Sequence, residues 1–239
     1  MADCTVVVLA YNLENYILDC LNSIEAQETV HTIKVLIHED CSTDKTLSVI
    51  NEFASKSKLH FDIVVPKENR YKKGMGFFYD LLLKVDTKYV AILDGDDVWT
   101  DKSKLQIQID QLESNSSLAI STHVFSIVTS DLQTELGTWP NCEYRHPIGR
   151  SSELAKENFI GALTAVFRRS ILPEALQGYN ALGTMTTQFG DCYPLVGTSV
   201  LLTKTWRNIV NMILKCMQIA PIRVADELLW SARFLLPIA

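Results

Sequence analysis

Runs of β-branched apolar residues alternate with apolar positions at helical spacing along the first half of the chain. The apolar runs are typical of buried strands, which we expect at residues 5–10, 33–38, 61–66 and 89–93. Helical spacing predicts helices at residues 17–26, 45–55, 77–84 and 104–113. Ser42 or Thr43 is expected to cap the second of these helices. Strands that alternate with helices predict an α/β fold with a parallel sheet.

The second half of the chain is less regular. Residues 118–129 predict one strand, within which His123 is a hydrogen-bonded histidine rather than a ligand. Residues 130–151 are polar, contain prolines and read as a loop region. Residues 206–239 mix apolar and basic positions, which indicates amphipathic helices.

Polar residues follow three of the expected strands, at the point where each strand ends. These segments are residues 10–12, residues 39–40 and residues 94–96. Ligands of open α/β sheets bind at the carboxyl edge, where such segments meet. We therefore expect one crevice formed by all three.

Asp94, Gly95 and Asp96 carry the most specific chemistry of the three segments. Asp94 and Asp96 project to one face of an extended backbone, and Gly95 lets the chain turn or lie close to a ligand. Two carboxylates on one face repel each other, and a divalent cation relieves that repulsion. Oxygen ligands suit Mg²⁺ or Mn²⁺, which complete their shells with phosphate oxygens. The alternative is an acidic turn that binds nothing.

Composition narrows the class of protein. The chain has 239 residues, of which 47% are hydrophobic, so it can form one large domain or two small ones. A net charge of −6 argues against nucleic acid as a partner. The cysteines are scattered without a CxxC pair, which predicts free thiols in a reducing compartment.

Neither the amino-terminal residues nor the apolar runs of the chain match a targeting signal. Residues 1–4 lack the basic and apolar regions of a signal peptide. An apolar run of about 18 residues, as needed to span a bilayer, does not occur. We therefore expect a cytoplasmic protein.

Three motifs together carry a resemblance to a known family. They are Val-Leu-Ala-Tyr-Asn at residues 8–12, Glu-Asp-Cys-Ser-Thr-Asp-Lys-Thr at residues 39–46, and Asp-Gly-Asp-Asp at residues 94–97. In this order and spacing they resemble the family 2 glycosyltransferases of the GT-A fold, closely over residues 3–130. The resemblance implies a GT-A core at residues 1–130, an acceptor-binding part at residues 131–205 and a helical segment at residues 206–239.

The resemblance assigns the nucleotide to the first two motifs. Ala10, Tyr11 and Glu14 match the loop that lines the base and ribose. Glu39 matches the carboxylate that accepts a hydrogen bond from the base ring. A carboxylate cannot accept from a ring nitrogen that lacks hydrogen, which favours the N–H of uracil, although guanine and thymine also carry one.

The phosphates and the donor sugar are assigned to later segments. Residues 67–76 match the loop over the phosphates, where Lys72 or Lys73 would pair with phosphate or else be solvated surface. Asp94 and Gly95 match the contact with ribose or donor sugar, and Asp96 matches the ligand of Mg²⁺ or Mn²⁺.

An inverting transfer also needs a general base that deprotonates the acceptor hydroxyl. The resemblance places this base after residues 158–170, and Asp191 is the choice there. Glu174 and Asp226 compete with it, and a helix cap is the structural alternative for Asp191. Arg168 and Arg169 either approach phosphate or flank a strand structurally.

The resemblance implies transfer of one sugar from a nucleotide-sugar, with a UDP-sugar as the favoured donor. The acceptor would be a hydroxyl-bearing glycan or a lipid-linked acceptor in polysaccharide or lipopolysaccharide assembly. The Gln-x-x-Arg-Trp motif of processive members is absent, which favours a single transfer. No histidine follows His146, although the family often places a metal or phosphate contact near the carboxyl terminus. That departure keeps open a catalytically inactive sugar-nucleotide-binding or scaffold subunit. Nucleotidyl transfer would need a glycine-rich phosphate loop after the first strand, and residues 11–14 are not one.

The tail at residues 206–239 has two alternative roles. Its interleaved apolar and basic residues suit peripheral contact with an anionic membrane, on the inner face of the plasma membrane where lipid-linked acceptors reside. Such a segment is more often a helix pair that packs on the core or forms a homodimer.

Overall fold

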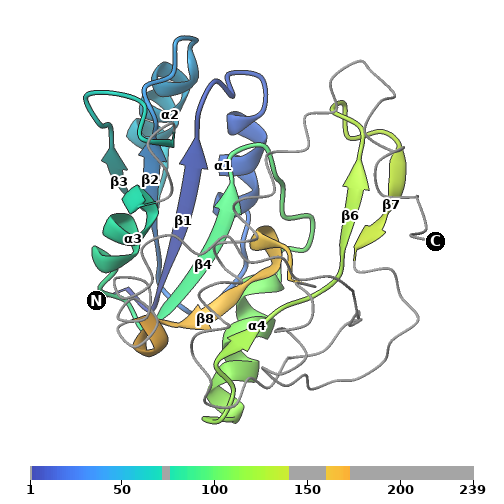
Figure 1. Cartoon of the computed structure of the whole chain (residues 1–239). Helices are drawn as coiled ribbons and strands as arrows, with labels where there is room; N and C mark the ends of the chain where they lie inside the picture. Colours follow the sequence, from blue (N-terminus) through green and yellow to red (C-terminus); the bar gives the residue numbers. More distant parts are fainter. Residues whose placement is uncertain (1, 72–75, 140–159, 173–239) are drawn as a thin grey trace, which may run out of the picture.

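The computed structural model describes residues 2–71, 76–139 and 160–172. In these ranges the chain forms a six-stranded sheet flanked by helices, with a separate two-stranded ribbon (Figure 1). The strands of the large sheet lie in the order β3-β2-β1-β4-β8-β5. The strands β1 to β4 run parallel, whereas β8 runs antiparallel to both its neighbours, β4 and β5. The expected α/β fold with a mostly parallel sheet is confirmed.

The strands of the large sheet are β1 (Cys4–Ala10), β2 (Ile33–Glu39), β3 (His60–Val64), β4 (Tyr89–Asp94), β5 (Ile120–Ser121) and β8 (Val166–Arg168). The helices are α1 (Ile17–Glu25), α2 (Thr46–Lys56), α3 (Gly76–Leu83) and α4 (Lys104–Ser114). Short 3-10 turns, η2 (Ala162–Thr164) and η3 (Arg169–Ile171), flank β8. The four predicted helices are therefore present, and none of their ends is shifted by more than one residue.

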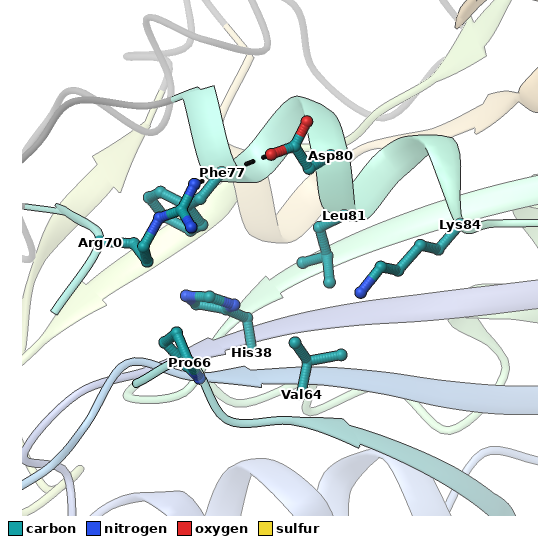
Figure 2. A pocket seen from close by; sticks show the side chains of 8 residues that line it. All are labelled: His38, Val64, Pro66, Arg70, Phe77, Asp80, Leu81 and Lys84. Carbon is teal, nitrogen blue, oxygen red and sulfur yellow. Dashed lines mark ion pairs between the residues drawn. The ribbon is translucent and has the colours of Figure 1, made fainter. Parts of the chain in front are cut away.

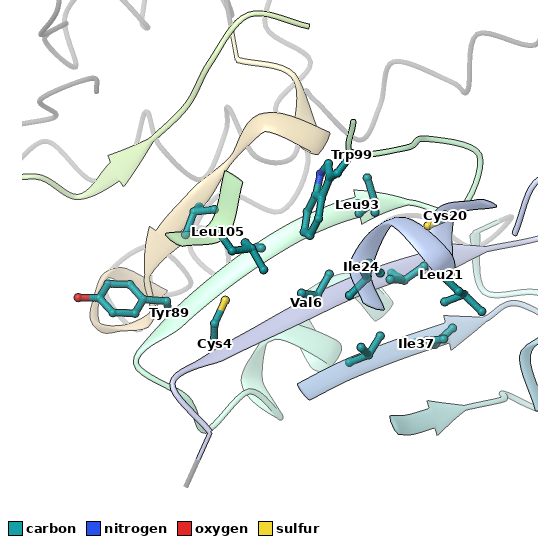
Figure 3. Close-up of a cluster of buried hydrophobic side chains, with 14 of the residues drawn as sticks. Cys4, Val6, Cys20, Leu21, Ile24, Ile37, Tyr89, Leu93, Trp99 and Leu105 are labelled. Carbon is teal, nitrogen blue, oxygen red and sulfur yellow. The ribbon is translucent and has the colours of Figure 1, made fainter. Parts of the chain in front are cut away.

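Two apolar clusters bury the two faces of the sheet. In the first cluster, α3 packs on strand residues whose side chains point to one face of the sheet, such as Val7, Val90 and Ile92. The second packs α1 and α4 on the opposite face, where Val6, Val8 and Leu93 point. Figure 3 shows part of this second cluster, from Cys4 to Trp99. A sheet that is buried on both faces explains why its central strands are continuously apolar rather than alternating.

The expected strand at residues 118–129 is wrong as a single element. The structure pairs only Ile120 and Ser121 with β8, and the chain then leaves the large sheet. Next to Thr122 the chain forms the 3-10 turn η2, which has no strand backbone to pair with. The Thr122 hydroxyl bonds the hydroxyl of Thr164 in this turn instead. Residues 125–128 become β6 (Phe125–Val128), which pairs with β7 (Glu135–Trp139) as the separate ribbon.

Two local expectations also need correction. The strand expected at residues 61–66 ends at Val64, two residues before Pro66. The expected caps of α2, Ser42 and Thr43, bond instead to Asn12, on the loop after β1. Lys45 occupies the N-cap position without a side-chain cap bond, and Asp44, one residue earlier, accepts the backbone N–H of Thr46 with its Oδ1 at 2.9 Å.

The described residues bear on two further expectations. Their three cysteines, Cys4, Cys20 and Cys41, are free thiols. Among the helices of these residues, none has the length and apolar character that crossing a membrane requires. The tail at residues 206–239 and most of the expected acceptor-binding part, residues 140–159 and 173–205, lie outside the described residues.

Candidate functional site

The carboxyl ends of β1, β2 and β4 stand level with one another. In the sheet register, Ala10 pairs with Glu39 and Leu9 pairs with Asp94. The strand order also reverses here, since β2 and β3 extend from one side of β1 and β4 lies on the other. Ligand crevices of open α/β sheets form at such a reversal. The three polar segments singled out in the sequence therefore meet at one edge (Figure 1).

A tight turn follows β4 and carries the acidic residues. The N–H of Asp97 donates to the carbonyl of Asp94 at 3.0 Å, and the N–H of Gly95 donates to Leu9 of the neighbouring strand at 2.9 Å. A Cβ atom at Gly95 would lie 2.9 Å from that same carbonyl oxygen and 2.9 Å from Leu13. Real Cβ atoms do not approach so closely, so the turn requires glycine because of backbone contact.

Burial and mutual repulsion shape the electrostatics of this turn. Burial, and then the charge of Asp96, raises the pKa of Asp94 from 3.8 to about 7. Burial raises the pKa of Asp97 well above its ordinary value, with Asp94 and Asp96 adding to the effect. The turn therefore holds more negative charge than its surroundings stabilise, and a bound cation would lower its energy.

The carboxylate oxygens of this turn are suitable ligands for a hard cation, but they are few. Carboxylate oxygens are the ligands that Mg²⁺ and Mn²⁺ prefer. Within the described ranges, however, no group of three or more His, Cys, Asp or Glu side chains is arranged to hold a metal ion. The fit is thus to an ion held by one or two carboxylates, with the rest of its shell supplied by water or ligand phosphate.

Two loops at the edge are joined by a set of reciprocal hydrogen bonds, here called the loop clasp (residues 12–14 with residues 42–46). The side chain of Asn12 accepts the N–H of Thr43 at 2.8 Å, and the hydroxyl of Ser42 accepts the N–H of Asn12 at 2.9 Å. The N–H of Leu13 donates to the hydroxyl of Thr46 at 2.7 Å. Asn12 has a φ of 54°, a left-handed conformation that asparagine tolerates. The clasp therefore fixes the chain directly after Tyr11.

Two of the predicted nucleotide contacts also bond to the backbone. Glu14 Oε2 accepts the N–H of Lys45 at 2.8 Å, which makes Glu14 a member of the clasp. Glu39 is buried, and its Oε1 accepts the N–H of Ser42 at 2.8 Å. Both carboxylates are therefore oriented before any ligand binds. Their expected contacts with a nucleotide stay predictions.

The sequence analysis missed three residues that organise this edge. Asn12 and Asp44 build the clasp, and Asp40 holds a neighbouring loop. Each of these residues lies within one of the sequence motifs. Its residue type alone, however, does not tell whether the side chain bonds to solvent, to a ligand or to the backbone. Only the partners decide, and those partners lie about thirty positions away along the chain.

Arg168 and Arg169 follow the structural alternative. Arg168 pairs with Tyr89 at the amino end of β4, the edge opposite to Asp94. Its guanidinium donates to the carbonyl of Leu118 at 2.8 Å, and that of Arg169 donates to the carbonyl of Val85. His123 also matches its expected structural role, since Nδ1 donates to the carbonyl of Val124 at 2.7 Å. Burial, with the charge of Lys104, lowers the pKa of His123 to about 4.

Several predicted site residues lie outside the described residues. They are Lys73 and its alternative Lys72, the proposed base Asp191, and its competitors Glu174 and Asp226. The described edge thus contains, as the last residues of β1, β2 and β4 or in the loops that follow β1 and β4, Ala10, Tyr11, Glu14, Glu39, Asp94, Gly95 and Asp96.

Comparison with known proteins identifies relatives of the chain. A family model described as "Glycosyl transferase family 2" matches residues 5–176. An uncharacterized protein of Mycobacterium tuberculosis is 30% identical over 165 residues, which are 69% of this chain and 46% of that protein. The dTDP-rhamnosyl transferase RfbG of Shigella flexneri is 33% identical over 123 residues, 50% of this chain and 42% of that protein. The chain thus spans about half the length of these curated relatives.

Solved structures share the fold. The TarS fragment 1-349 of S. aureus superposes with a TM-score of 0.54 at 21% identity, over 72% of this chain and 48% of that one. The mannosyltransferase PcManGT of Pyrobaculum calidifontis, solved with GDP-Man and Mn²⁺, gives a TM-score of 0.52 at 18% identity, over 84% of this chain and 58% of that one. The second of these neighbours was thus solved with both a nucleotide-sugar and a metal ion.

Proposed function

The chain belongs to glycosyl transferase family 2, and from this premise we propose that it transfers one sugar from a nucleotide-sugar to a hydroxyl group of an acceptor. The observation that carries this proposal is the register that sets Ala10, Glu39 and the Asp94 turn level at one sheet edge. The acceptor would be a glycan or a lipid-linked glycan in the assembly of polysaccharide or lipopolysaccharide. RfbG, named as a rhamnosyl transferase, supports a transfer of this class.

The donor proposed first is a UDP-sugar. Glu39 is a buried, oriented carboxylate at the edge where the base would lie, and it cannot accept a hydrogen bond from a ring nitrogen that lacks hydrogen. Uracil, thymine and guanine each carry a ring N–H, whereas the ring nitrogen of cytosine at the corresponding position does not. Tyr11, held by the loop clasp, would pack against the base, and Ala10 leaves room for it. The name of RfbG makes dTDP the alternative to UDP.

Asp96 would hold the metal ion, with Asp94 beside it contacting the ribose or the donor sugar. The two carboxylates and Gly95 lie on the turn after β4, so the diphosphate would lie across the carboxyl end of that strand. A bound Mg²⁺ or Mn²⁺ supplies electrostatic stabilisation of the departing nucleoside diphosphate. The residues of the turn would orient the donor with its anomeric carbon towards the acceptor.

An inverting displacement would complete the reaction. The base, Asp191 in this proposal, would take the proton of the acceptor hydroxyl as its oxygen attacks the anomeric carbon from the side opposite the phosphate. One in-line displacement inverts the configuration. A catalytically inactive subunit would bind the nucleotide without turnover.

Thermal unfolding with UDP, dTDP, GDP and CDP, each with and without Mn²⁺, tests the donor and the metal together. A ligand that binds only the folded protein raises the unfolding midpoint. We expect UDP to give the largest shift, in a Mn²⁺-dependent manner, and Asp96→Ala to abolish the Mn²⁺-dependent part.

Glu52→Gln, which removes an exposed carboxylate from α2, is the matched control and should retain the full shift. Donor hydrolysis and transfer to acceptor glycans then separate an enzyme from an inactive subunit, with Asp191→Asn as the variant that should bind UDP but not turn over. A wild-type protein whose midpoint no nucleotide shifts would refute the proposal.

A further inference from the structure

The acidic turn after β4, here taken as residues 94–99, is bound at both of its ends by α1. At the first end, the thiol of Cys20 donates to the carbonyl of Asp94 at 3.6 Å. At the second end, the backbone N–H of Trp99 donates to the hydroxyl of Ser23 at 3.1 Å, and that hydroxyl donates in turn to the carbonyl of Cys20 at 2.7 Å. The turn is therefore held against α1 on either side of Asp96.

Trp99 also binds the turn η2, which packs against β4. The indole ring is buried, and its Nε1–H donates to the carbonyl of Leu163 at 2.8 Å. The next carbonyl of η2, that of Thr164, accepts the side-chain amide of Gln108 on α4 at 2.9 Å. Two consecutive carbonyls of η2 are thus bound, one from the end of the acidic turn and one from α4.

Lys104, the first residue of α4, closes this arrangement. Its ammonium lies 4.1 Å from the centroid of the Trp99 ring and donates to Gln108 Oε1 at 2.7 Å. A cation above an aromatic ring is attracted by the negative face of that ring. Trp99, Lys104 and Gln108, with the η2 carbonyls that Trp99 and Gln108 bind, are here called the tryptophan bracket. The bracket joins the acidic turn, α4 and η2 in one closed set of contacts.

The charge of Lys104 is buried without an opposite charge. The residue is only 5% exposed, and within the described ranges no carboxylate pairs with its ammonium. Burial lowers the pKa of Lys104 to about 7. An unpaired buried charge destabilises the folded state. The Trp99 ring and Gln108 Oε1 offset part of this effect, so the three side chains of the bracket depend on one another.

A cavity on the opposite face of the sheet shows the more usual arrangement of charge (Figure 2). It has a volume of about 120 Å³ and is lined by residues of β2, β3, α3 and the loop after β3. Arg70 pairs with Asp80 across it, with 3.8 Å between the charged atoms, and both side chains are partly exposed. Charges at this cavity stay hydrated, whereas the charge of Lys104 depends on the bracket.

We propose that Lys104 is a positioning residue that holds the Trp99 ring and thereby sets the acidic turn against η2 in the geometry that binds a divalent cation. This inference rests on the proposed function, in which Asp96 holds the metal ion. It assigns Lys104 and Trp99 no contact with the ion or with the nucleotide. An ion held by few carboxylates also binds ligand phosphate, so the position of the turn decides whether both can reach it.

Lys104→Met tests the inference, because methionine fills much of the same space and carries no charge. Calorimetry gives the Kd for UDP with and without Mn²⁺, and the factor by which Mn²⁺ lowers the Kd measures the contribution of the ion. We expect Lys104→Met to reduce this factor at least about fivefold, while the Kd without Mn²⁺ stays within about twofold. Trp99→Phe keeps a ring for the ammonium, removes the Nε1–H bond, and should reduce the factor similarly. If the wild type binds dTDP rather than UDP, dTDP replaces UDP in each titration.

The effects of the two substitutions should not add. If Lys104 acts through Trp99, the double variant should lose no more of the Mn²⁺ effect than the more affected single variant. The amides of Thr164 and Ala165 bond within η2, and their hydrogen exchange should become faster in both single variants.

Lys88→Met is the matched control. The ammonium of Lys88 lies 5.3 Å from the centroid of the Tyr89 ring at the opposite end of the sheet. The same substitution there removes a contact between a lysine and an aromatic ring far from the acidic turn. It should leave both Kd values and the exchange of the η2 amides unchanged.

Several results would overturn the inference alone. They are a wild-type Mn²⁺ effect in folded Lys104→Met, equal weakening of the Kd with and without Mn²⁺, fully additive losses in the double variant, and unchanged exchange of the η2 amides. If Lys104→Met does not fold, an unchanged Mn²⁺ effect in Trp99→Phe overturns it. A wild-type protein that binds neither UDP nor dTDP, or whose affinity does not respond to Mn²⁺, refutes the proposed donor or metal site, and the inference with it.

Discussion

At the scale of single residues, the turn after β4 concentrates carboxylates at the edge of the sheet. Asp94, Asp96 and Asp97 occupy one turn, and the pKa values of Asp94 and Asp97 rise because burial and mutual repulsion penalise their ionised forms. Gly95 permits this crowding, since only a residue without a Cβ fits against the carbonyl of Leu9. Such stored repulsion is typical of sites that bind a cation or an anion–cation pair.

The titration of Asp94 should be visible in stability. The folded protein keeps the Asp94 proton up to about pH 7, whereas the unfolded chain releases it near the ordinary value of 3.8. Between these values the folded state binds more protons, so without divalent cations the free energy of unfolding should fall as the pH rises, by up to about 1.4 kcal/mol per pH unit. Above about pH 5.5, urea unfolding should show a shallower fall for Asp94→Asn and an unchanged one for Glu52→Gln, because the lowered pKa of Glu52 affects stability only at lower pH. Parallel pH profiles of the wild type and Asp94→Asn would contradict the assignment.

At the scale of elements, the loop after β1 is held by the start of α2. Asp44 has two partners there, because its Oδ1 accepts the N–H of Thr46 at 2.9 Å and its Oδ2 accepts that of Glu14 at 3.1 Å. Burial acts to raise the pKa of Asp44, yet hydrogen bonds from Thr46 and Glu14 outweigh it and the pKa is lowered. Asp44 thus both bonds the first residue of α2 and forms one side of the loop clasp.

Asp44→Ala should therefore cost more than the loss of an ordinary surface side chain. We expect a loss of roughly 1–2 kcal/mol in the free energy of unfolding, as for other capping residues. Urea unfolding measures it, with Ser55→Ala as the control at the exposed carboxyl end of the same helix, where the change should stay within about 0.5 kcal/mol. Equal losses in the two variants would show that the clasp contributes little to stability.

At the scale of the molecule, stability is distributed unevenly over the described residues. The strands β1 and β4 are buried on both faces and lie at the centre of the large sheet. The ribbon of β6 and β7 pairs only with itself and exposes Leu136 at 58%. A two-stranded ribbon is marginally stable without packing. Its described anchor is Phe125, whose ring lies against Gly161 so closely that a Cβ there would come within 2.5 Å.

Hydrogen exchange should follow this division. Amides of β1 and β4 should exchange only through global unfolding. Those of β6 and β7 should exchange at least about tenfold faster in the wild-type protein. Mass spectrometry of the exchanging protein resolves the two sets, with α2 as an internal reference on the surface. Equal protection of the ribbon and the central strands would mean that the ribbon is part of the core.

The order of strands and helices, the mostly parallel sheet and the meeting of three polar segments at one edge were all predictable from the sequence. They follow from local apolar periodicity and from the parallel direction of strands joined by helices, which brings their carboxyl ends to the same edge. The partners of Asn12, Asp40 and Asp44, the antiparallel insertion of β8 and the division of residues 118–129 depended on the tertiary structure. A polar side chain bonds whichever group the fold brings within about 3 Å, and residues distant in sequence supply that group.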